Sequence, residues 1–368
     1  MEQLTFHAPG RVNLIGEHTD YNGGYVLPCA LRMGTLAKVT MRDDDMACFA
    51  SANFPDTHEV PLNRVEYDPA HTWANYPKGV LFFLQQVAKE KGIAMRGFNI
   101  VLDGDIPNEA GLSSSASVEV VTAVALNEVF GLGLSMLELV KIAKRAENEF
   151  CNVNCGIMDQ FAVGMCKKDH AVFLHCNTLE YEHVPLNFGD YKIVIMNTNK
   201  KRTLADSKYN ERRAECEQAA AILGVAELAE LSPENFREDK LADPILLKRA
   251  RHIIHENHRV KMAVEAMRNN SLADFGRLLV ESHNSLRDDY EVSCRELDVL
   301  VEAALKNPAC LGARMTGAGF GGCAIALVKD ECVADFSREI VAAYESAIGY
   351  APSLYVQESG DGARRVYM

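Results

Sequence analysis

The sequence lacks the features that mark nucleic-acid-binding and membrane proteins. Its 368 residues include 38 lysines and arginines against 51 aspartates and glutamates, a formal net charge of −13. This argues against a nucleic-acid partner, because proteins that read the phosphate backbone normally carry a basic excess. No uninterrupted apolar run approaches the roughly 18 residues that a membrane helix requires, and the first residues lack the basic and apolar regions of a signal peptide. We therefore expect a cytoplasmic protein without membrane attachment.

The sequence also lacks a metal or disulfide signature. Its 11 cysteines form no C-x-x-C pair, which argues against a zinc ribbon or a disulfide framework. Cys151 and Cys155 are spaced like neighbours on a helix, where we expect a reduced pair. His252, His255 and His258 form no H-E-x-x-H motif, so we interpret them as a solvated helix face. No G-x-x-x-x-G-K-[ST] motif occurs, which excludes an ordinary P-loop enzyme.

The composition is that of an ordinary globular protein, with 48% apolar and 24% charged residues. A chain of this length exceeds what one hydrophobic core usually holds, so we expect two domains. The alternation of strand and helix patterns breaks around residues 182–190. We place the domain boundary there, which divides the chain into residues 1–186 and 187–368. Both halves mix strand and helix patterns with few parallel β-α-β units, so we predict the α+β fold class.

The periodicity of apolar residues predicts strands and helices in both halves. In the first half, strands are predicted at 25–31, 35–41 and 97–102, and helices at 118–130 and 135–151. In the second half, strands are predicted at 191–197, 312–316, 323–328 and 353–357. Helices are predicted at 207–223 and 332–348, and helical segments dominate between residue 223 and about residue 306.

Residues 10–24, Gly-Arg-Val-Asn-Leu-Ile-Gly-Glu-His-Thr-Asp-Tyr-Asn-Gly-Gly, concentrate polar side chains between glycines. Arg11, Glu17, His18 and Asp20 can converge on a polyol, because carboxylates accept hydrogen bonds from hydroxyls and an imidazole donates or accepts them. A solvated turn explains such a loop equally well.

Two further glycine loops carry possible chemistry. Residues 107–117, Pro-Asn-Glu-Ala-Gly-Leu-Ser-Ser-Ser-Ala-Ser, lead into a predicted helix, whose N-terminal N–H groups would bind an anion such as phosphate. The alternative is that the serines only cap the helix. Residues 317–322 contain G-x-G-x-x-G but precede a strand, so they are not a dinucleotide motif. We expect a tight turn that lets the backbone approach the active site, with a plain hairpin turn as the alternative.

Together, these loops resemble the galactokinase branch of the GHMP kinases. Similar segments are residues 155–160, 282–291 and 314–322, in the family's order along nearly the whole chain. The resemblance implies an N-terminal domain like the second domain of ribosomal protein S5, a ferredoxin-like C-terminal domain, and an active site between them. It also implies Mg²⁺-dependent transfer of the γ-phosphoryl group of ATP to the anomeric hydroxyl of α-D-galactose, the first kinase step of Leloir catabolism. The acidic composition is compatible with a monomer, which we expect.

The resemblance also implies roles for individual residues. Asp159 matches the catalytic base and Arg11 the arginine beside it, a cation that keeps a carboxylate ionised. The family's sugar positions are matched by Glu17, His18, Thr19, Asp20, Gly156, Asp159 and Tyr209, its nucleotide positions by Glu109, Ala110, Gly111, Leu112, Ser113, Ser114 and Ser115, and its Mg²⁺ positions by Ser115 and Glu147.

Three assignments have alternatives. Tyr209 can be a packing residue, since a lone tyrosine in a charged helix usually packs. Glu149 can replace Glu147 as the metal ligand. Glu109 stands where family members commonly have glycine, and its carboxylate either repels the nucleotide phosphates or points to solvent.

The substrate also has alternatives, because the sequence does not size the pocket around the C2 and C5 substituents of the sugar. The chain could phosphorylate N-acetylgalactosamine, arabinose or galacturonate. It could also be a sugar sensor without activity, which only Glu109 favours.

Overall fold

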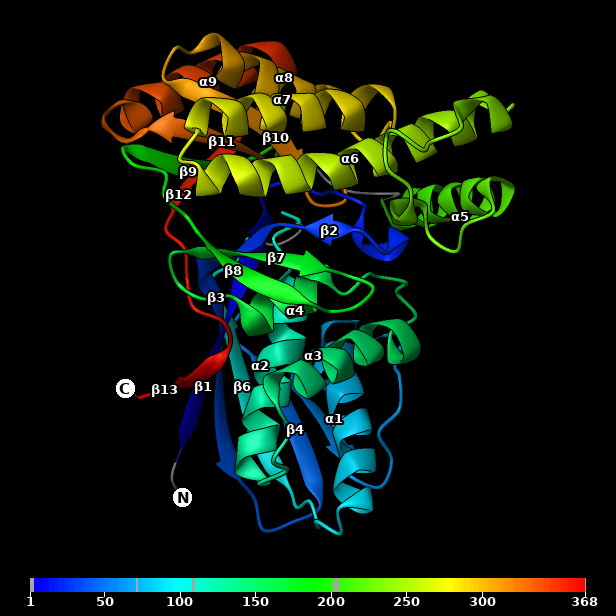
Figure 1. Cartoon of the computed structure of the whole chain (residues 1–368). Helices are drawn as coiled ribbons and strands as arrows, with labels where there is room; N and C mark the ends of the chain where they lie inside the picture. The colour runs from blue at the N-terminus through cyan, green and yellow to red at the C-terminus, as the bar shows by residue number, and fades with distance from the viewer. Residues whose placement is uncertain (1–2, 71, 108–109, 201–204, 368) are drawn as a thin grey trace.

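The structure, a computed structural model, describes residues 3–70, 72–107, 110–200 and 205–367, and it consists of two lobes (Figure 1). The first lobe is built on a six-stranded sheet whose neighbouring strands are antiparallel except for the parallel β4 and β6. In order along the sheet, the strands are β13 (Arg364–Val366), β1 (Leu4–Asn13), β3 (Pro28–Met41), β6 (Phe98–Gly104), β4 (Met46–Ser51) and β5 (His58–Pro61).

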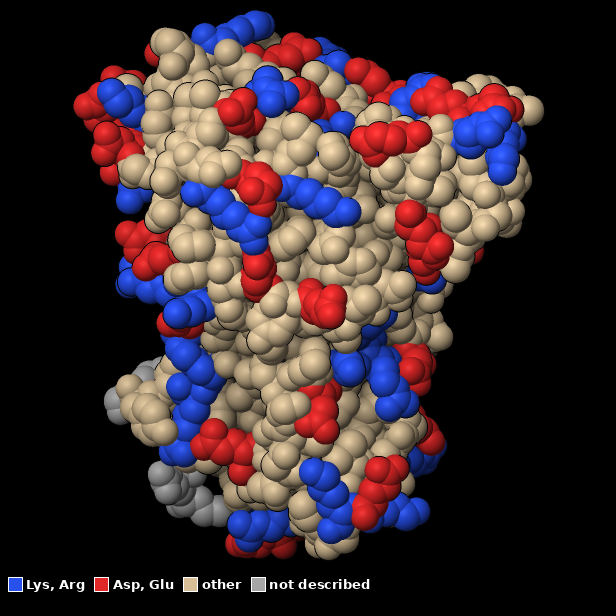
Figure 2. Space-filling view, viewed as in Figure 1, with Lys and Arg blue, Asp and Glu red and all other residues tan. Residues whose placement is uncertain are grey.

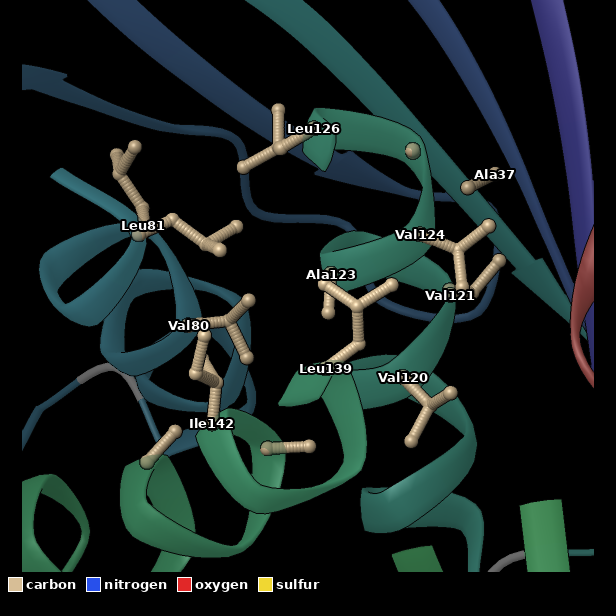
Figure 3. Close-up of a cluster of buried hydrophobic side chains, with 14 of the residues drawn as sticks. Ala37, Val80, Leu81, Val120, Val121, Ala123, Val124, Leu126, Leu139 and Ile142 are labelled. Atoms are coloured by element: carbon tan, nitrogen blue, oxygen red, sulfur yellow. The ribbon is translucent and has the colours of Figure 1, made fainter. Parts of the chain in front are cut away.

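Three helices pack with this sheet and enclose the core of the first lobe. They are α1 (Thr72–Glu90), α2 (Ser114–Val129) and α3 (Met136–Arg145). Figure 3 shows side chains of all three helices meeting, among them Leu81, Ala123 and Leu139, which are buried. The apolar residues of α2 surround the helix rather than forming one stripe, which is typical of a helix buried on several sides. This packing fixes where α2 begins, and its first turn faces the site described below.

A small three-stranded sheet lies between the two large ones in Figure 1. Its strands are β2 (Tyr25–Val26), β7 (His170–His175) and β8 (Tyr181–Pro185). The short helix α4 (Met158–Met165) precedes β7 and packs against β1 and β3.

The second lobe is an antiparallel four-stranded sheet with helices. The order of its strands is β10 (Cys310–Thr316), β11 (Cys323–Lys329), β9 (Tyr191–Asn197) and β12 (Ser353–Gln357). Helices α7 (Leu272–Asp288), α8 (Arg295–Lys306) and α9 (Val333–Ile348) pack on the sheet, while α6 (Pro244–Arg268) lies between the lobes beside α5 (Ala205–Leu223). The strand order is that of a ferredoxin-like domain, as predicted, with α5 to α8 between β9 and β10 and with α9 between β11 and β12.

The predicted α+β class is confirmed, and most predicted elements are present. The strand predicted at 191–197 is β9, and the helix predicted at 118–130 is α2, which begins earlier, at Ser114. Two strands predicted at 25–31 and 35–41 are mainly one long strand, β3. Gly34 is needed there because a Cβ would overlap the backbone of β1, so this glycine marks a close approach and not a turn.

The structure corrects three other expectations. The helix predicted at 135–151 ends at Arg145 and continues as a π-helical turn over Ala146–Phe150, so Cys155 lies in a loop and is no helical neighbour of Cys151. The break expected around 182–190 begins inside strand β8. His252 is not on a solvated face: it is fully buried, because this side of α6 faces α7 and the loop after β1.

The division of the chain at residue 186 stays a prediction. The end of the described chain returns to the first lobe, since Ser359 pairs with Leu31 and β13 pairs with β1. On the face seen in Figure 2, acidic and basic side chains are interspersed over most of the surface, and several basic side chains adjoin along the left side. None of the helices in the described ranges is long and apolar enough to cross a bilayer.

Candidate active site

A cavity of about 760 Å³ lies where the two lobes meet. Its walls come from the loop after β1, the start of α2, the segment before α4, helix α5 and the turn after β10. Most of the predicted site residues line it together, namely Arg11, Glu17, His18, Asp20, Gly111, Ser113, Ser114, Ser115, Glu147, Gly156, Asp159 and Tyr209. The structure therefore gathers residues that are up to 198 positions apart, from Arg11 to Tyr209.

An arginine–aspartate pair lies in this cavity. Arg11, near the end of β1, donates from Nε and Nη2 to Oδ1 of Asp159, at 2.9 and 2.8 Å. Its Nη1 donates to the carbonyl of Gly111 at 2.7 Å, which ties the pair to the loop before α2. Ser113 donates from Oγ to the other oxygen of Asp159, Oδ2, at 2.6 Å. The carboxylate at the start of α4 is thus held by hydrogen bonds on both oxygens.

The first turn of α2 is open to the cavity. Ser113 takes the N-cap position with a left-handed backbone, φ 62°, and makes no side-chain capping bond, because its hydroxyl is bonded to Asp159. The N–H groups of the first turn therefore have no side-chain cap, and the positive end of the helix dipole lies at Ser114 and Ser115, which line the cavity. This geometry favours an anion site over serines that only cap the helix.

Two buried acidic side chains share a hydrogen-bond partner near the start of α2. Glu147 is buried, and burial together with the nearby charge of Asp159 raises its pKa to about 7. Gln160 donates from Nε2 to Glu147 and to the buried Glu119, whose pKa burial also raises. Glu149, the alternative to Glu147, instead forms an exposed ion pair with Arg145 and does not line the cavity.

Glu17 connects the two lobes. Its Oε1 accepts hydrogen bonds from the N–H of Gly317 at 2.8 Å, from Oγ1 of Thr316 at 3.0 Å and from Nη1 of Arg314 at 3.3 Å. Gly317 and Ala318 line the cavity, so the glycine turn does bring backbone into the site as expected. Gly317 has φ 83°, a conformation that glycine adopts without strain.

His18, Asp20 and Tyr209 form a polar and aromatic wall. The ring of Tyr209 lies 5.6 Å from that of His18, so the tyrosine from α5 both packs and lines the cavity. Burial lowers the pKa of His18 to about 3, so its imidazole is neutral. Burial and the charges of Asp159 and Glu17 raise the pKa of Asp20 to about 6. A Cβ at Gly156 would overlap Oδ2 of Asp20, so only glycine fits there.

Four predicted residues do not line the cavity or cannot be placed. Thr19 is fully buried and donates from Oγ1 to the carbonyls of Gly16 and Tyr25, so it braces the loop after β1. The side chains of Ala110 and Leu112 are buried beside the site. Glu109 lies outside the described residues.

The aromatic end of the cavity is not among the predicted site residues. Phe54, Trp73 and Tyr76 line it, and the rings of Phe54 and Trp73 are stacked at 6.0 Å with an angle of 8°. They come from the loop after β4 and from the start of α1, segments without any motif. The only sequence signal is that Trp73 is the single tryptophan of the chain.

Comparisons with known proteins agree with this geometry. Three family models match the chain: "GHMP kinases N terminal domain" over residues 75–167, "Galactokinase galactose-binding signature" over residues 1–40, and "GHMP kinases C terminal" over residues 263–345. The galactokinase of Clostridium beijerinckii is 51% identical over 373 residues, covering 99% of this chain and 95% of that protein. The galactokinase of Bacillus subtilis is 49% identical over 370 residues, covering 98% and 94%.

Solved structures show the same relationship. A crystal structure of Lactococcus lactis galactokinase complexed with galactose superposes with a TM-score of 0.95 at 46% identity, covering 99% of this chain and 95% of that one. The mevalonate kinase of Methanococcus jannaschii has a TM-score of 0.71 at 19% identity, covering 98% and 99%, a likeness of fold alone.

Proposed function

Because the chain belongs to the galactokinase family of the GHMP kinases, we propose that its cavity transfers the γ-phosphoryl group of ATP to the anomeric hydroxyl of α-D-galactose. The products are galactose 1-phosphate and ADP, and the reaction is the first kinase step of galactose catabolism. The observation that carries the proposal is the Arg11–Asp159 pair beside the open first turn of α2. The binding of galactose by the Lactococcus lactis relative supports this choice of sugar.

Asp159 acts as the general base. Its carboxylate accepts the proton of the anomeric hydroxyl while the sugar oxygen forms a bond to the γ-phosphorus. The bond between that phosphorus and the β-γ bridging oxygen breaks, and ADP leaves with its electron pair. Arg11 holds Asp159 in place and offsets part of the charge on the transferring group, and the 2.6 Å bond from Ser113 orients the second carboxylate oxygen.

The sugar is held between the two lobes by Glu17, His18, Asp20 and Tyr209, with Gly156 leaving space beside Asp20. Buried groups of this kind reject an epimer, because the wrong stereochemistry leaves them without hydrogen-bond partners. Thr19 contributes through the shape of the loop, since its hydroxyl is occupied by two carbonyls.

ATP is held at the other side of Asp159. The N–H groups at the start of α2 and the hydroxyls of Ser114 and Ser115 face the phosphates. The aromatic end with Phe54, Trp73 and Tyr76 is an apolar slot that suits the flat face of the adenine ring.

Ser115 and Glu147 fit a magnesium ion. Glu147 is a buried carboxylate crowded by the charge of Asp159 and bonded to the hydroxyl of Ser115, and a hard cation there would relieve this repulsion. Ser115 and Glu147 would hold the Mg²⁺ that accompanies ATP, and the ion would supply positive charge that offsets the charge on the phosphoryl group during transfer. Glu149 is the poorer candidate because it is exposed and paired with Arg145.

We propose that the enzyme acts as a monomer in the cytoplasm. The described cysteines are all free, which fits a reducing compartment, and ATP is an intracellular substrate.

The test is ADP release coupled to a detector reaction, with Mg-ATP and galactose, glucose, N-acetylgalactosamine, arabinose or galacturonate as the sugar. We expect turnover with galactose far above the other sugars, and a loss of at least about 100-fold in kcat for Asp159→Asn. Faster turnover with another sugar would show that this sugar, and not galactose, is the substrate. Unchanged turnover of Asp159→Asn would show that Asp159 is not the general base. Galactose binding without turnover would identify a sensor.

A further inference from the structure

The side chain of Gln160 joins three separate elements of the first lobe. Gln160 follows Asp159 in α4 and is fully buried. Its Nε2 donates to Oε2 of Glu147 at 2.5 Å and to Oε2 of Glu119 at 3.1 Å. Glu147 lies in the π-helical turn after α3, and Glu119 lies in α2, one turn beyond Ser115. One amide nitrogen therefore ties α4, the π-helical turn and α2 together.

Two hydrogen bonds end on the same oxygen of Glu147. Besides the bond from Gln160, Oε2 accepts one from Sγ of Cys155 at 3.4 Å. The backbone of Glu147 is fixed as well, because its carbonyl accepts a hydrogen bond from the N–H of Val153 at 3.0 Å. Turns of this π-helical kind are rare and occur frequently at functional sites. With Oε2 engaged, Oε1 is the oxygen that Glu147 can present to the cavity, which it lines beside Ser115.

The buried position of Glu119 calls for a physical reason. Its side chain is fully buried and is not among the residues that line the cavity in the described part of the chain. Burial of a carboxyl group is costly, and Oε1 of Glu119 has no hydrogen-bond partner in the described ranges. Val120 and Val121, its neighbours in α2, are equally buried, so packing alone would favour an apolar side chain here. The carboxyl group adds an acceptor for the amide of Gln160.

We propose that Gln160 is a positioning residue for the magnesium ion that accompanies ATP and that Glu119 anchors it: the amide holds Oε2 of Glu147, so that Oε1 faces the ion beside Ser115. The inference rests on the proposed function, because it takes Glu147 and Ser115 as the residues that hold the ion. It adds two residues that contact neither the ion nor a substrate. Removing a group that orients a metal ligand typically lowers metal affinity 10- to 100-fold.

The first experiment measures how strongly the metal and the nucleotide favour each other's binding, without turnover. The Kd of AMPPNP, an ATP analogue that cannot transfer its terminal phosphoryl group, is measured by calorimetry in EDTA and with saturating Mg²⁺. The ratio of the two Kd values is the coupling between the ion and the nucleotide. The variant is Gln160→Met, which keeps the length of the side chain and removes the amide.

We expect Gln160→Met to lower this coupling ratio at least tenfold and to leave the Kd in EDTA within about twofold of the wild type. The matched control is Gln85→Met in α1. Gln85 also donates from Nε2, to the carbonyl of Leu62 at 2.7 Å, and it does not line the cavity. Its coupling ratio should equal that of the wild type.

Two results of this experiment would overturn the inference. The first is a coupling ratio that Gln160→Met leaves unchanged. The second is a Kd that rises equally in EDTA and in Mg²⁺, because Gln160 would then support the fold or the nucleotide site and not the metal ligand.

The second experiment tests the anchor with variants of Glu119 that have a similar volume. Glu119→Gln keeps an acceptor oxygen for Gln160 and should keep the coupling ratio within about twofold. Glu119→Leu removes the acceptor and should lower the ratio about threefold or more, the range for one lost hydrogen bond. The double variant with Gln160→Met should be no worse than Gln160→Met alone. Additive losses would show that Glu119 acts independently of Gln160 and would refute the anchor.

These measurements use neither galactose nor turnover, so the inference and the proposed function can fail separately. A wild-type protein without galactose-dependent ADP release, in which Gln160→Met still lowers the coupling ratio, would refute the proposed function alone. An active wild type in which Gln160→Met leaves the ratio unchanged would refute the inference alone.

Discussion

Arg314 from β10 donates to the backbone carbonyls of Asn13 and Leu14, at 2.9 and 3.1 Å, and thereby joins the second lobe to the end of β1. The same guanidinium approaches Glu17 at 3.3 Å, and neither side chain is exposed beyond 2%. This arginine holds the loop that carries Glu17, His18 and Asp20 against the other lobe.

Replacing Arg314 with methionine should lower the free energy of unfolding by about 3–5 kcal/mol, because the change removes the buried guanidinium that pairs with the Glu17 carboxylate and donates to two backbone carbonyls. Urea denaturation measures the effect. The matched control is Arg338→Met on α9, whose pair with Asp335 is exposed and contributes at most about 1 kcal/mol. An equal decrease in the free energy of unfolding for both variants would show that the buried contacts of Arg314 do not stabilise the protein more than an exposed ion pair does.

Gly156→Ala should raise KM for galactose strongly, by about 100-fold, because the new methyl group displaces Asp20 from the sugar wall. Titration of ATP binding should give an unchanged Kd. Gly92→Ala is the control: its φ of 68° makes alanine unfavourable by about 1 kcal/mol, but no atom lies within 4 Å of the added carbon and the site is remote. Normal galactose kinetics in Gly156→Ala would contradict the placement of Asp20.

The single tryptophan offers an optical test of the nucleotide site. Trp73 stacks with Phe54 in the cavity, so ATP should change its fluorescence in a saturable way, and galactose alone should not. Trp73→Phe keeps a ring in the slot and should raise KM for ATP only about twofold, whereas Trp73→Ala should raise it about tenfold. A fluorescence change that follows galactose rather than ATP would reverse the assignment of the two ends of the cavity.

Acid stability should depend on Glu256 of α6. Burial alone would raise its pKa, but Arg259, His252 and Arg314, together with the hydroxyl of Ser282, lower it to about 2, below the unfolded value of 4.5. A carboxyl with a depressed folded-state pKa stabilises the protein above its unfolded pKa, and this contribution is lost as pH falls through the folded value.

The unfolding free energy of the wild type should therefore exceed that of Glu256→Gln at neutral pH, and the difference should shrink between about pH 4.5 and 2. Thermal unfolding at a series of pH values measures it. A difference that stays constant over this range would show that Glu256 does not titrate as stated.

The sequence was sufficient for the residues that come in local motifs. Arg11, Asp159 and residues 113–115 belong to glycine-containing motifs at the end of β1, the start of α4 and the start of α2, and the ends of strands and helices meet at the site. The strands of the second lobe were predictable from their apolar pattern, whereas its ferredoxin-like arrangement followed from the family resemblance, and helices α6, α7 and α8 were predicted only as one mostly helical stretch.

The sequence was not sufficient where a contact depends on packing between distant segments. Phe54 and Trp73 come together only when the loop after β4 folds against α1, and no spacing encodes that. The burial of His252 depends on which face of α6 turns toward the other lobe, and the helix itself is polar on several sides. The three residues of β13 include two arginines and so carry no apolar alternation.

The pairing of β13 with β1 affects how the protein folds during synthesis. Strand β1 leaves the ribosome among the first residues, whereas the strand that completes its edge leaves only after the whole second lobe has been made. For most of translation, the N–H and C=O groups along that edge are therefore open to water or to other nascent chains.

The chain also crosses between the lobes twice. Both connecting segments must therefore change conformation in any opening of the lobes that releases product.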